Sequence, residues 1–560
     1  MPGGEIQLSA IGSENQMLTG NPQITFFKEM YKRYTNFSME NIDVLIEGST
    51  QLSFTGTTTM KVKIPRNGDL LKSMYLRLQL PDIYSNKDEF FWTRAVGLAM
   101  INHVDIFIGS TKVERLTGEF LDIWSQVHHS PEKRKQFQQM VGDIPELSYH
   151  EHDKFYKQFS DTDSGTINEN KFYNTRPSIK GRELHIPLEF WFMRNSSSAL
   201  PLVALQYMDV EVVIEFKAVK DLYTVLEYKD DIPVKSPGPD FKNIHLLNAK
   251  RVIPTSNNHI SKYLSTKMNL NVNHSLDLEP HLELNYIFLD DDERRRFAST
   301  NQEYLIEQVT YYKELGNVGT CNIEIEAYHL VKEFFFTCTR DDNDTRNEWL
   351  NYSSLEHRPI PTHRDNFEYN DDLWNKTTSL TDFIQADGSA GTNTTGIVIS
   401  STTPVFKYTY TTEDFIKFKS YWPYRYFEDI PKITLDNFRA YEKNPLLSCE
   451  ILFQGFVRQS ERKTQYFNEL QSYEYHTSNL EQPINIYSFA LDPESNYQPT
   501  GACNFSRLEN MQLNLELVTP PTHTINNEVK NKWYYNINVF MINYNILTIA
   551  SGMGGLRYAN

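Results

Sequence analysis

Two distant parts of the chain carry the same pattern of short apolar segments, and this internal repeat restricts the fold more than any other feature. Residues 106–109 read IFIG and are followed eleven positions later by Phe120, while residues 452–455 read LFQG and are followed eleven positions later by Tyr466. Self-similarity of this kind indicates one structural unit built twice. We therefore expect two similar domains in tandem.

A second pair of segments supports the repeat and indicates its structural class. Residues 209–216 (DVEVVIEF) and 510–517 (NMQLNLEL) both alternate between apolar and polar side chains, which is typical of half-buried strands. Neither half shows the alternation of strands and helices that marks a parallel sheet. The pattern predicts an all-β chain of two β-sandwiches, each with about eight strands in Greek-key order. Because the identity between the copies is weak, a chance likeness of two β-patterns remains an alternative.

Length and composition agree with this architecture and exclude several functions. The 560 residues suit two large all-β domains, and the 34 Phe and 33 Tyr favour pleated sheets. Asp and Glu outnumber Lys and Arg by 72 to 55, which gives a net charge of −17 and disfavours direct nucleic-acid binding. The four Cys have no close spacing, so neither a disulfide scaffold nor a zinc knuckle is expected.

No targeting or membrane segment is expected. No run of about 18 apolar residues occurs, and the first ten residues, MPGGEIQLSA, lack the basic region and apolar core of a secretory signal. The sequence predicts folding in the cytosol of the cell that makes the protein.

Four stretches outside the strand pattern carry predictions of their own. Ile24, Phe27 and Tyr31 have helical spacing, so residues 1–34 are predicted to be an arm with one or two helical turns. Residues 120–139 are the best helical candidate of the first half, and residues 290–296 (DDDERRR) are expected to be a solvated linker. The last stretch, residues 551–560, is expected to be a flexible tail because it is rich in glycine.

Several motifs place the chain beside a known family. They occur in order along the whole sequence: GNPQITFFK at 20–28, LPLVALQY at 200–207, NYIFLDDDERRRF at 285–297, YSFAL at 487–491 with GACNFSR at 501–507, and SGMGGL at 551–556. Together they resemble the signatures of the major capsid proteins of nucleocytoplasmic large DNA viruses. Two stretches, 218–280 and 339–430, look longer than in compact members of that family, which affects the outer surface only.

The resemblance implies a double jelly roll, which is a pair of eight-stranded jelly-roll sandwiches with short helices and long surface loops. The implied division consists of an N-terminal arm (1–34), a first jelly roll (35–290), an interdomain linker (291–303), a second jelly roll (304–550) and a C-terminal tail (551–560). It also implies a structural protein that is not an enzyme and that forms homotrimers. These trimers are the pseudo-hexagonal capsomers of an icosahedral virion.

The resemblance further implies partners and a location. Neighbouring capsomers and minor capsid proteins beneath the shell are the expected partners, the latter through residues 1–34, with no direct nucleic acid. Glycans or a cap protein on the long outer loops are also expected, with the virion as the location and the host cytoplasm as the place of assembly. Two alternatives stay open: a minor capsid, penton or glycan-binding β-sandwich protein, and a glycan-processing enzyme using Glu324 and Glu326.

Candidate site residues are few, and no catalytic, cofactor-binding or metal site is predicted. Glycosylation sequons within the long polar stretch 339–405 make four asparagines candidates for modification: Asn343, Asn351, Asn375 and Asn393. Residues 150–153 (HEHD) have metal-ligand side chains without convergent spacing, so a solvated loop is favoured. His128 and His129 are expected at the surface. Ser389 does not lie in a nucleophile elbow, and residues 552–555 lack the context of a phosphate loop.

Overall fold

The computed structural model describes most of both halves of the chain. The described residues are 3–29, 31–46, 50–84, 89–148, 179–228, 249–255, 258–264, 275–355, 397–398, 407–408, 444–495, 497–508, 510–520, 522–525, 528–531 and 533–558.

The first half of the chain forms a sandwich of two antiparallel sheets. One sheet has the order β1 (Phe37–Leu45), β14 (His281–Leu289), β4 (Leu70–Gln79) and β8 (Glu183–Pro187), with β9 (Leu200–Pro201) also paired to β4. The other has the order β3 (Thr58–Lys63), β10 (Val210–Phe216), β6 (Ile101–Ile108) and β7 (Thr111–Thr117). Apolar side chains of both sheets share one buried cluster, which is the core of this sandwich.

The second half forms another sandwich with its own buried cluster. One sheet has the order β15 (Gln302–Asn317), β27 (Tyr535–Ala550), β17 (Leu330–Arg340) and β22 (Asn485–Ser488), with β23 (Cys503–Asn504) on β17 and β28 (Met553–Leu556) on β27. The other has the order β16 (Thr320–Ile325), β24 (Met511–Leu517), β20 (Leu446–Phe453) and β21 (Phe456–Lys463).

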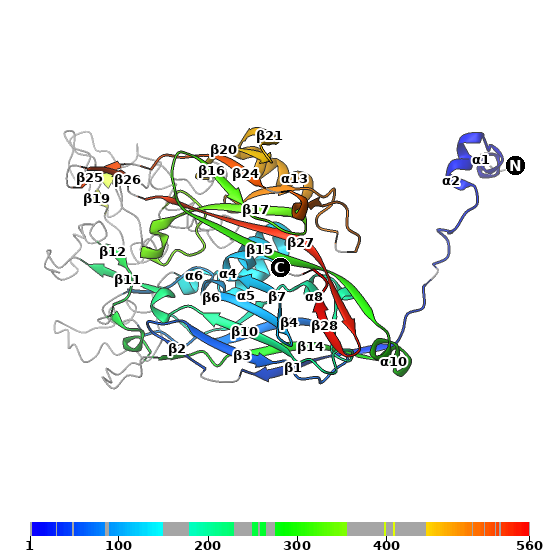
Figure 1. The fold of residues 1–560 in the computed structure, drawn as a ribbon, viewed down its shortest axis with the longest axis horizontal. Helices are drawn as coiled ribbons and strands as arrows, with labels where there is room; N and C mark the ends of the chain where they lie inside the picture. The colour runs from blue at the N-terminus through cyan, green and yellow to red at the C-terminus, as the bar shows by residue number, and fades with distance from the viewer. Residues whose placement is uncertain are drawn as a thin grey trace.

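The two sandwiches repeat the same strand order. Ranked by position in the chain, the eight main strands of each half follow the sequence first, eighth, third, sixth in one sheet and second, seventh, fourth, fifth in the other. This is the order of a jelly roll, in which Greek-key connections join two packed sheets. Figure 1 shows the two sandwiches stacked, with their long strands running in similar directions. The predicted all-β, double jelly-roll fold is confirmed.

The repeated glycines have a shared structural cause. Gly109 directly follows β6 and Gly455 directly precedes β21. Each glycine therefore lies in the tight turn of a hairpin, β6–β7 or β20–β21. Their φ angles are +61° and +79°, a region that residues with a Cβ adopt at a steric cost. The motif seen in the sequence is therefore the turn between the fourth and fifth strands of each sandwich.

Helices are short and sit between strands. After β7 come α4 (Gly118–His128), α5 (Pro131–Val141) and α6 (Pro145–Ser148), and after β21 come the π-helix η11 (Tyr466–Leu470) and α13 (Gln471–Tyr475). The helical prediction for 120–139 is confirmed for most of that stretch, but it forms two helices, α4 and α5, instead of one. The chain breaks at Ser130, whose side chain caps α5 by accepting from the Lys133 N–H, and Pro131 cannot continue α4.

The remaining described elements are small. Further strands are β2 (Gln51–Ser53), β5 (Glu89–Trp92), β11 (Tyr223–Tyr228), β12 (Ala249–Val252), β13 (Ser275–Asp277), β18 (Ile397–Val398), β19 (Lys407–Tyr408), β25 (Thr522–Ile525) and β26 (Glu528–Asn531). Further helices are α3 (Val96–Ala99), α8 (Trp191–Arg194), η2 (Ser196–Ser198), η3 (Val219–Asp221), η5 (Ile260–Lys262), η6 (Asp341–Arg346) and η12 (Phe505–Arg507). No helix in the described ranges is long and apolar enough to cross a membrane.

The N-terminal segment projects from the body, as Figure 1 shows. Its helices are α1 (Gly3–Ser9) and α2 (Ser13–Thr19), and every described residue of this segment is exposed. The helical turns predicted from Ile24 to Tyr31 are absent from the described part of that stretch, so that prediction is wrong. Its apolar side chains have no core to cover here, and without such burial a short helix is marginal.

The expected linker is exposed but helical, and the tail expected to be flexible is ordered. Residues 290–296 lead into helix α10 (Asp291–Ser299), which is exposed but has acidic residues in its first turn and Arg296 in its last, favourable for the helix dipole. The tail forms β28 against β27, and a Cβ on Gly554 would lie only 2.8 Å from Leu205 Cδ2 of the first half. The glycines predicted to make the tail flexible instead allow its close approach.

Candidate functional site at the junction of the two sandwiches

Helix α4 of the first half packs on the outer face of a sheet of the second half. Phe120 of α4 lies with its ring centroid 5.8 Å from that of Phe540 on β27, and both side chains are buried. Further along α4, His128 meets Phe335 of β17 edge-on, with 5.9 Å between ring centroids. The sheet that contains β17 and β27 is therefore covered on both faces, inside by its own core and outside by α4.

A carboxylate of α4 anchors this contact. Glu119 Oε1 accepts from Asn538 Nδ2 at 2.8 Å and from Thr337 Oγ1 at 3.3 Å, and both donors belong to the second half. Burial raises the pKa of Glu119 to about 7, although Lys313 and Lys217 nearby oppose the rise. This carboxyl therefore titrates near neutral pH within the junction.

A chain of alternating charges crosses the junction beside α4. Arg194 of α8 reaches Glu114 Oε1 on β7 and Glu307 Oε2 on β15, each at 3.4 Å, and Lys332 on β17 donates to Glu307. The Arg194 guanidinium also lies 4.3 Å from the centroid of the Trp124 ring. Burying these charges is costly, so their mutual pairing fixes how the two halves meet.

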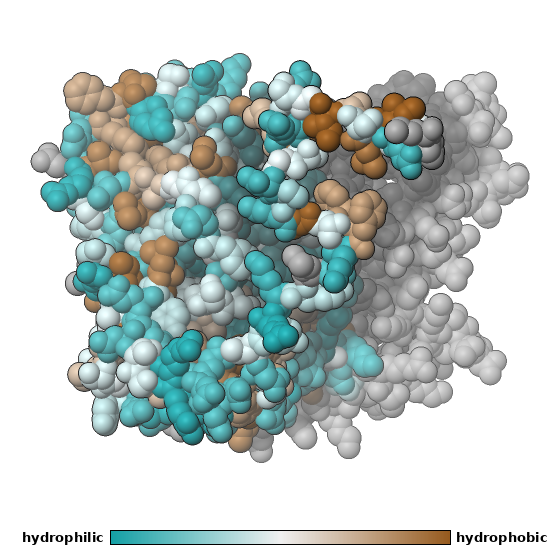
Figure 2. Space-filling view, turned by 90° about the vertical axis from the view of Figure 1, so that its right-hand side faces the viewer, coloured by the Kyte–Doolittle hydropathy of each residue, from teal (hydrophilic) through white to brown (hydrophobic). Residues whose placement is uncertain are grey.

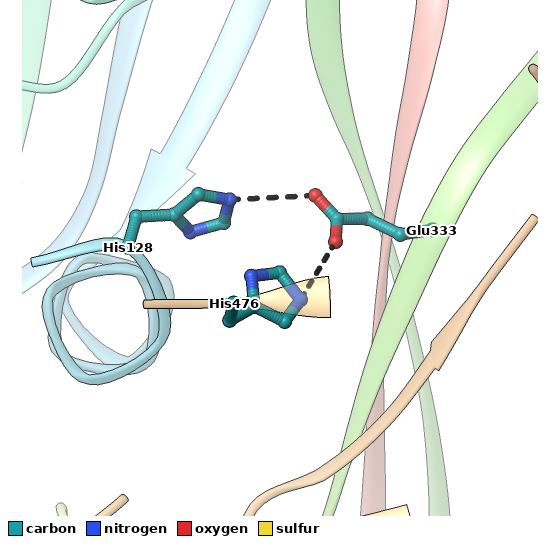
Figure 3. Close-up of side chains that lie close together, drawn as sticks. All are labelled: His128, Glu333 and His476. Carbon is teal, nitrogen blue, oxygen red and sulfur yellow. Dashed lines mark ion pairs between the residues drawn. The ribbon is translucent and has the colours of Figure 1, made fainter. Parts of the chain in front are cut away.

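Three further side chains converge at the C-terminal end of α4. Figure 3 shows His128 and His476 directed at the carboxylate of Glu333, which comes from β17. His128 Nε2 lies 3.4 Å from Glu333 Oε1, and His476 Nε2 lies 3.3 Å from Glu333 Oε2. The side chains of Glu333 and His476 are 0% exposed and that of His128 is 9% exposed. We call these three residues the junction cluster.

The charge states within the junction cluster are set by competition between burial and pairing. Burial alone would raise the pKa of Glu333, but the two imidazoles outweigh it and hold this pKa well below its ordinary value. Burial lowers the pKa of His128 to about 4 against the opposing effect of Glu333. For His476 the same effect of burial is outweighed by Glu333 and Glu494, which raise its pKa to about 9. These opposite shifts favour the positive charge on His476 over His128 near neutral pH.

Sequence reasoning missed this cluster. His128 and His129 were expected at the surface, which is wrong: His129 is 4% exposed and its Nε2 lies 3.8 Å from Glu189 Oε1. One signal was available, because Trp124 and His128 are four residues apart and so share a face of a predicted helix. Glu333 stands inside the apolar run of β17, which also marks it as unusual. Nothing in the sequence places His476 beside them.

Two of the four candidate asparagines lie in the described part of the chain, and both are buried. Asn343 is 4% exposed and its Nδ2 donates to the Asn351 carbonyl at 3.0 Å, while Asn351 is 0% exposed and its Nδ2 donates to the Leu355 carbonyl at 3.0 Å. A sugar on either nitrogen would require this corner to open. Asn375 and Asn393 lie outside the described residues.

The other sequence candidates that the structure describes do not form a site. Glu324 of β16 and Glu326 just beyond it are both exposed on the sheet of β16, β24, β20 and β21, away from the junction cluster. Residues 552–555 fall in the turn before β28 and in that strand, which is not a phosphate loop. Residues 150–153 and Ser389 lie outside the described residues.

Exposed apolar side chains mark surfaces that this chain leaves uncovered. On the second sandwich, Phe456 of β21 is 79% exposed and Tyr473 of α13 is 87% exposed, and on the N-terminal segment Phe27 is 97% exposed. Figure 2 shows the end of the molecule that carries α10, where hydrophobic residues form separate patches among hydrophilic ones. Large apolar side chains exposed in groups are typical of contact surfaces.

Comparison with known proteins identifies the family. A family model described as "Major capsid protein N-terminus" matches residues 25–290, and one described as "Large eukaryotic DNA virus major capsid protein" matches residues 293–555, so that together they match nearly the whole chain. The major capsid protein of Phaeocystis pouchetii virus is 29% identical, with 100% of both chains covered. The major capsid protein of Paramecium bursaria Chlorella virus 1 is 25% identical, again with 100% of both covered.

Solved structures share the fold over the same extent. A chain of the PBCV-1 virus capsid is similar with a TM-score of 0.58 and 22% identity, covering 96% of this chain and 100% of that one. The Faustovirus major capsid protein is similar with a TM-score of 0.57 and 10% identity, covering 96% of this chain and 94% of that one. With the repeated strand order, the buried junction and these matches, the chain belongs to the major capsid proteins of large eukaryotic DNA viruses and is a structural capsid protein.

Proposed function

We propose that three copies of this capsid protein form a ring-shaped homotrimer that serves as a pseudo-hexagonal capsomer of an icosahedral shell. The observation that carries the proposal is the identical strand order of the two sandwiches within one chain. Three chains then supply six similar blocks around a central axis. Closed cyclic symmetry joins one flank of each chain to a different flank of its neighbour.

The fixed junction supports this role. A six-sided block keeps its shape only if the two sandwiches of each chain do not rotate against each other. The buried aromatic contact of Phe120 with Phe540 and the charge chain through Arg194 resist such rotation. The proposed action is assembly through contacts between copies, without a catalytic step.

The division of the chain follows the same proposal. Residues 35–290 and 304–550 act as the two jelly rolls, 291–303 joins them, and 551–560 closes the second on the first. Residues 1–34 act as an arm that reaches minor capsid proteins beneath the shell, for which their exposed Phe26 and Phe27 are suited. A cap protein or glycans are the proposed partners of the long stretches 218–280 and 339–430, with Asn375 and Asn393 as the candidate glycan acceptors. Assembly takes place in the host cytoplasm and the product is the virion shell.

The oligomeric state tests the proposal directly. The purified full-length chain is expected to sediment as a single species at three times the 65.5 kDa chain mass and to show hexagonal outlines in negative stain. A variant without residues 1–34 is the matched control, and it should still form the trimer while losing binding to the minor capsid proteins. A full-length chain that stays monomeric at micromolar concentration would contradict the proposal.

A further inference from the structure

The junction cluster of His128, Glu333 and His476 has the composition of a transition-metal site. Two imidazoles and one carboxylate are ligands that zinc accepts, whereas calcium and magnesium prefer oxygen ligands alone. One ligand atom from each residue can be chosen so that all three lie within 4.8 Å of one another. His128 comes from the first half of the chain and the other two from the second, so a bound ion would join the two sandwiches.

Two distances in the junction cluster, which run to different oxygens of Glu333, are compatible with a bound metal, and the three ligand atoms lie within 4.8 Å of one another. Zinc bonds of about 2.0–2.2 Å in tetrahedral directions place neighbouring ligand atoms about 3.3 Å apart. The two contacts of Glu333 with the imidazoles measure 3.4 and 3.3 Å. A direct hydrogen bond between these groups would be shorter, about 2.7–2.9 Å, because it is assisted by charge.

The polar atoms of the junction cluster have no hydrogen-bond partner among the described residues. This holds for both nitrogens of His128, both nitrogens of His476 and both oxygens of Glu333. Leaving buried polar atoms unpaired costs about 1–3 kcal/mol each, so a native structure rarely keeps several in one place. A cation between the three side chains would satisfy one atom of each.

A second layer of contacts orients the ligands as in known metal sites. His476 Nδ1, the nitrogen away from Glu333, lies 3.5 Å from Glu494 Oε1. Glu494 is itself held by the Thr477 N–H at 3.0 Å. A carboxylate behind a ligand histidine fixes the ring and raises its basicity toward the metal. His128 is fixed differently, by stacking on Trp124 with 3.6 Å between ring centroids and 16° between the planes.

The charges nearby leave a place for a divalent cation. The carboxylates facing the junction cluster are Glu333 and Glu494, and the nearest cation is Lys332, 3.8 Å from Glu333 Oε1. Lys332 is already paired with Glu307. A metal binds imidazole only in its neutral form, so the ion would replace the proton on His476, and its two positive charges would balance Glu333 and Glu494.

We propose that His128, Glu333 and His476 bind a zinc-class divalent cation that ties the first sandwich to the second. The ion would use one nitrogen of each imidazole and the carboxylate of Glu333, with its remaining position open to water. Its role would be to stabilise the junction, since His128 approaches the other two ligands only when α4 is docked on β17. The capsid role of the protein does not depend on this ion.

Zinc content of the full-length protein tests the proposal. Wild-type protein purified without chelator, then loaded with zinc sulfate and gel-filtered, is expected to hold about one zinc per chain by elemental mass spectrometry. His476→Gln should lose it, and Glu494→Gln should weaken zinc affinity about 10- to 100-fold, because it removes only the orienting carboxylate. His185→Gln is the matched control, since His185 also lies near two glutamates, at 3.5 and 3.6 Å, but is 37% exposed on β8. It should keep the full zinc content.

Two outcomes would overturn the proposal. One is wild-type protein that retains no zinc above the His476→Gln level, and the other is equal zinc loss in His185→Gln. If His476→Gln does not fold, X-ray absorption of the zinc-loaded wild type decides the matter. Two imidazoles in the first coordination shell are expected, and a shell without imidazole would refute the site.

Discussion

Strands β4 and β17 hold the same position in the two sandwiches but differ in what they bury. Along β4 the residues from Met74 to Gln79 alternate between buried and more exposed, as in a sheet with one covered face. Along β17 every residue from Val331 to Arg340 is buried. The difference arises because α4 packs on the outer face of β17, while the outward-facing side chains of β4 from Tyr75 to Gln79 stay partly exposed.

Two copies of one fold therefore need not be equivalent within a chain. A strand covered on both faces reads as a continuous apolar run, and β17 indeed contains Phe334, Phe335 and Phe336 in sequence. Phe334 and Phe336 belong to the core of the second sandwich, whereas Phe335 belongs to the cluster that continues from the first. The junction is thus an extension of the first core onto the second sheet.

The largest expected loss of stability comes from a substitution at Phe335 of β17. Phe335→Ala should lower the free energy of unfolding by about 3–5 kcal/mol, because it empties a fully buried site. The control is Tyr75→Ala on β4, the strand of the same rank in the first sandwich. Because the Tyr75 side chain is only half-buried, we expect its loss in free energy of unfolding to be about 2 kcal/mol smaller. Urea titration followed by tryptophan fluorescence measures both. Equal losses would show that the outer face of β17 is not buried against the first sandwich.

A second prediction uses the pH dependence of the junction. The pKa of Glu119 is raised from its ordinary value of 4.5 to about 7, so the folded protein holds a proton that the unfolded chain releases between those values. Its contribution to stability is therefore full below about pH 4.5 and is lost as the pH rises through about 7. Glu119→Gln should remove this loss. The free energy of unfolding of the variant, relative to wild type, should therefore rise by about 2 kcal/mol from pH 5 to pH 8.

Urea midpoints at the two pH values measure this gain. Glu211→Gln on the exposed side of β10 is the control and should show the same difference from wild type at both. A constant difference for Glu119→Gln across the range would mean that this carboxyl does not change its protonation on folding.

The smallest expected effect concerns helix α10, which joins the sandwiches. Arg294 donates from Nε to Asp69 Oδ1 and from Nη2 to Asp69 Oδ2, both at 2.9 Å, and is 43% exposed. Arg294→Ala should lower the midpoint of thermal unfolding only slightly, since partly exposed ion pairs contribute little to stability. Arg295→Ala is the control, because Arg295 is 79% exposed and its contact with Asp292 is 4.0 Å long. If the two variants have the same midpoint of thermal unfolding, the contact of Arg294 with Asp69 does not hold α10 to the first sandwich.

Local sequence signals were reliable where a single chain segment decides its own structure. The alternating segments 209–216 and 510–517 became β10 and β24, and the glycines at 109 and 455 became equivalent hairpin turns. For 120–139 the same reasoning found the helical character but not the break, where the cap at Ser130 and the ring of Pro131 separate α4 from α5. It failed for the tail, because composition cannot show that Gly554 lies against Leu205.

The all-β class, the tandem repeat and the family could be inferred from the sequence alone, since they depend on the period of apolar residues and on motifs within short segments. The packing of α4 on the second sheet can be seen only in the tertiary structure. It is this packing that brings His128, Glu333 and His476 together. These three residues are separated by 205 and 143 positions, and their contact depends on how two finished sandwiches pack. Periodicity specifies which face of a segment is buried, but not which distant segment will cover it.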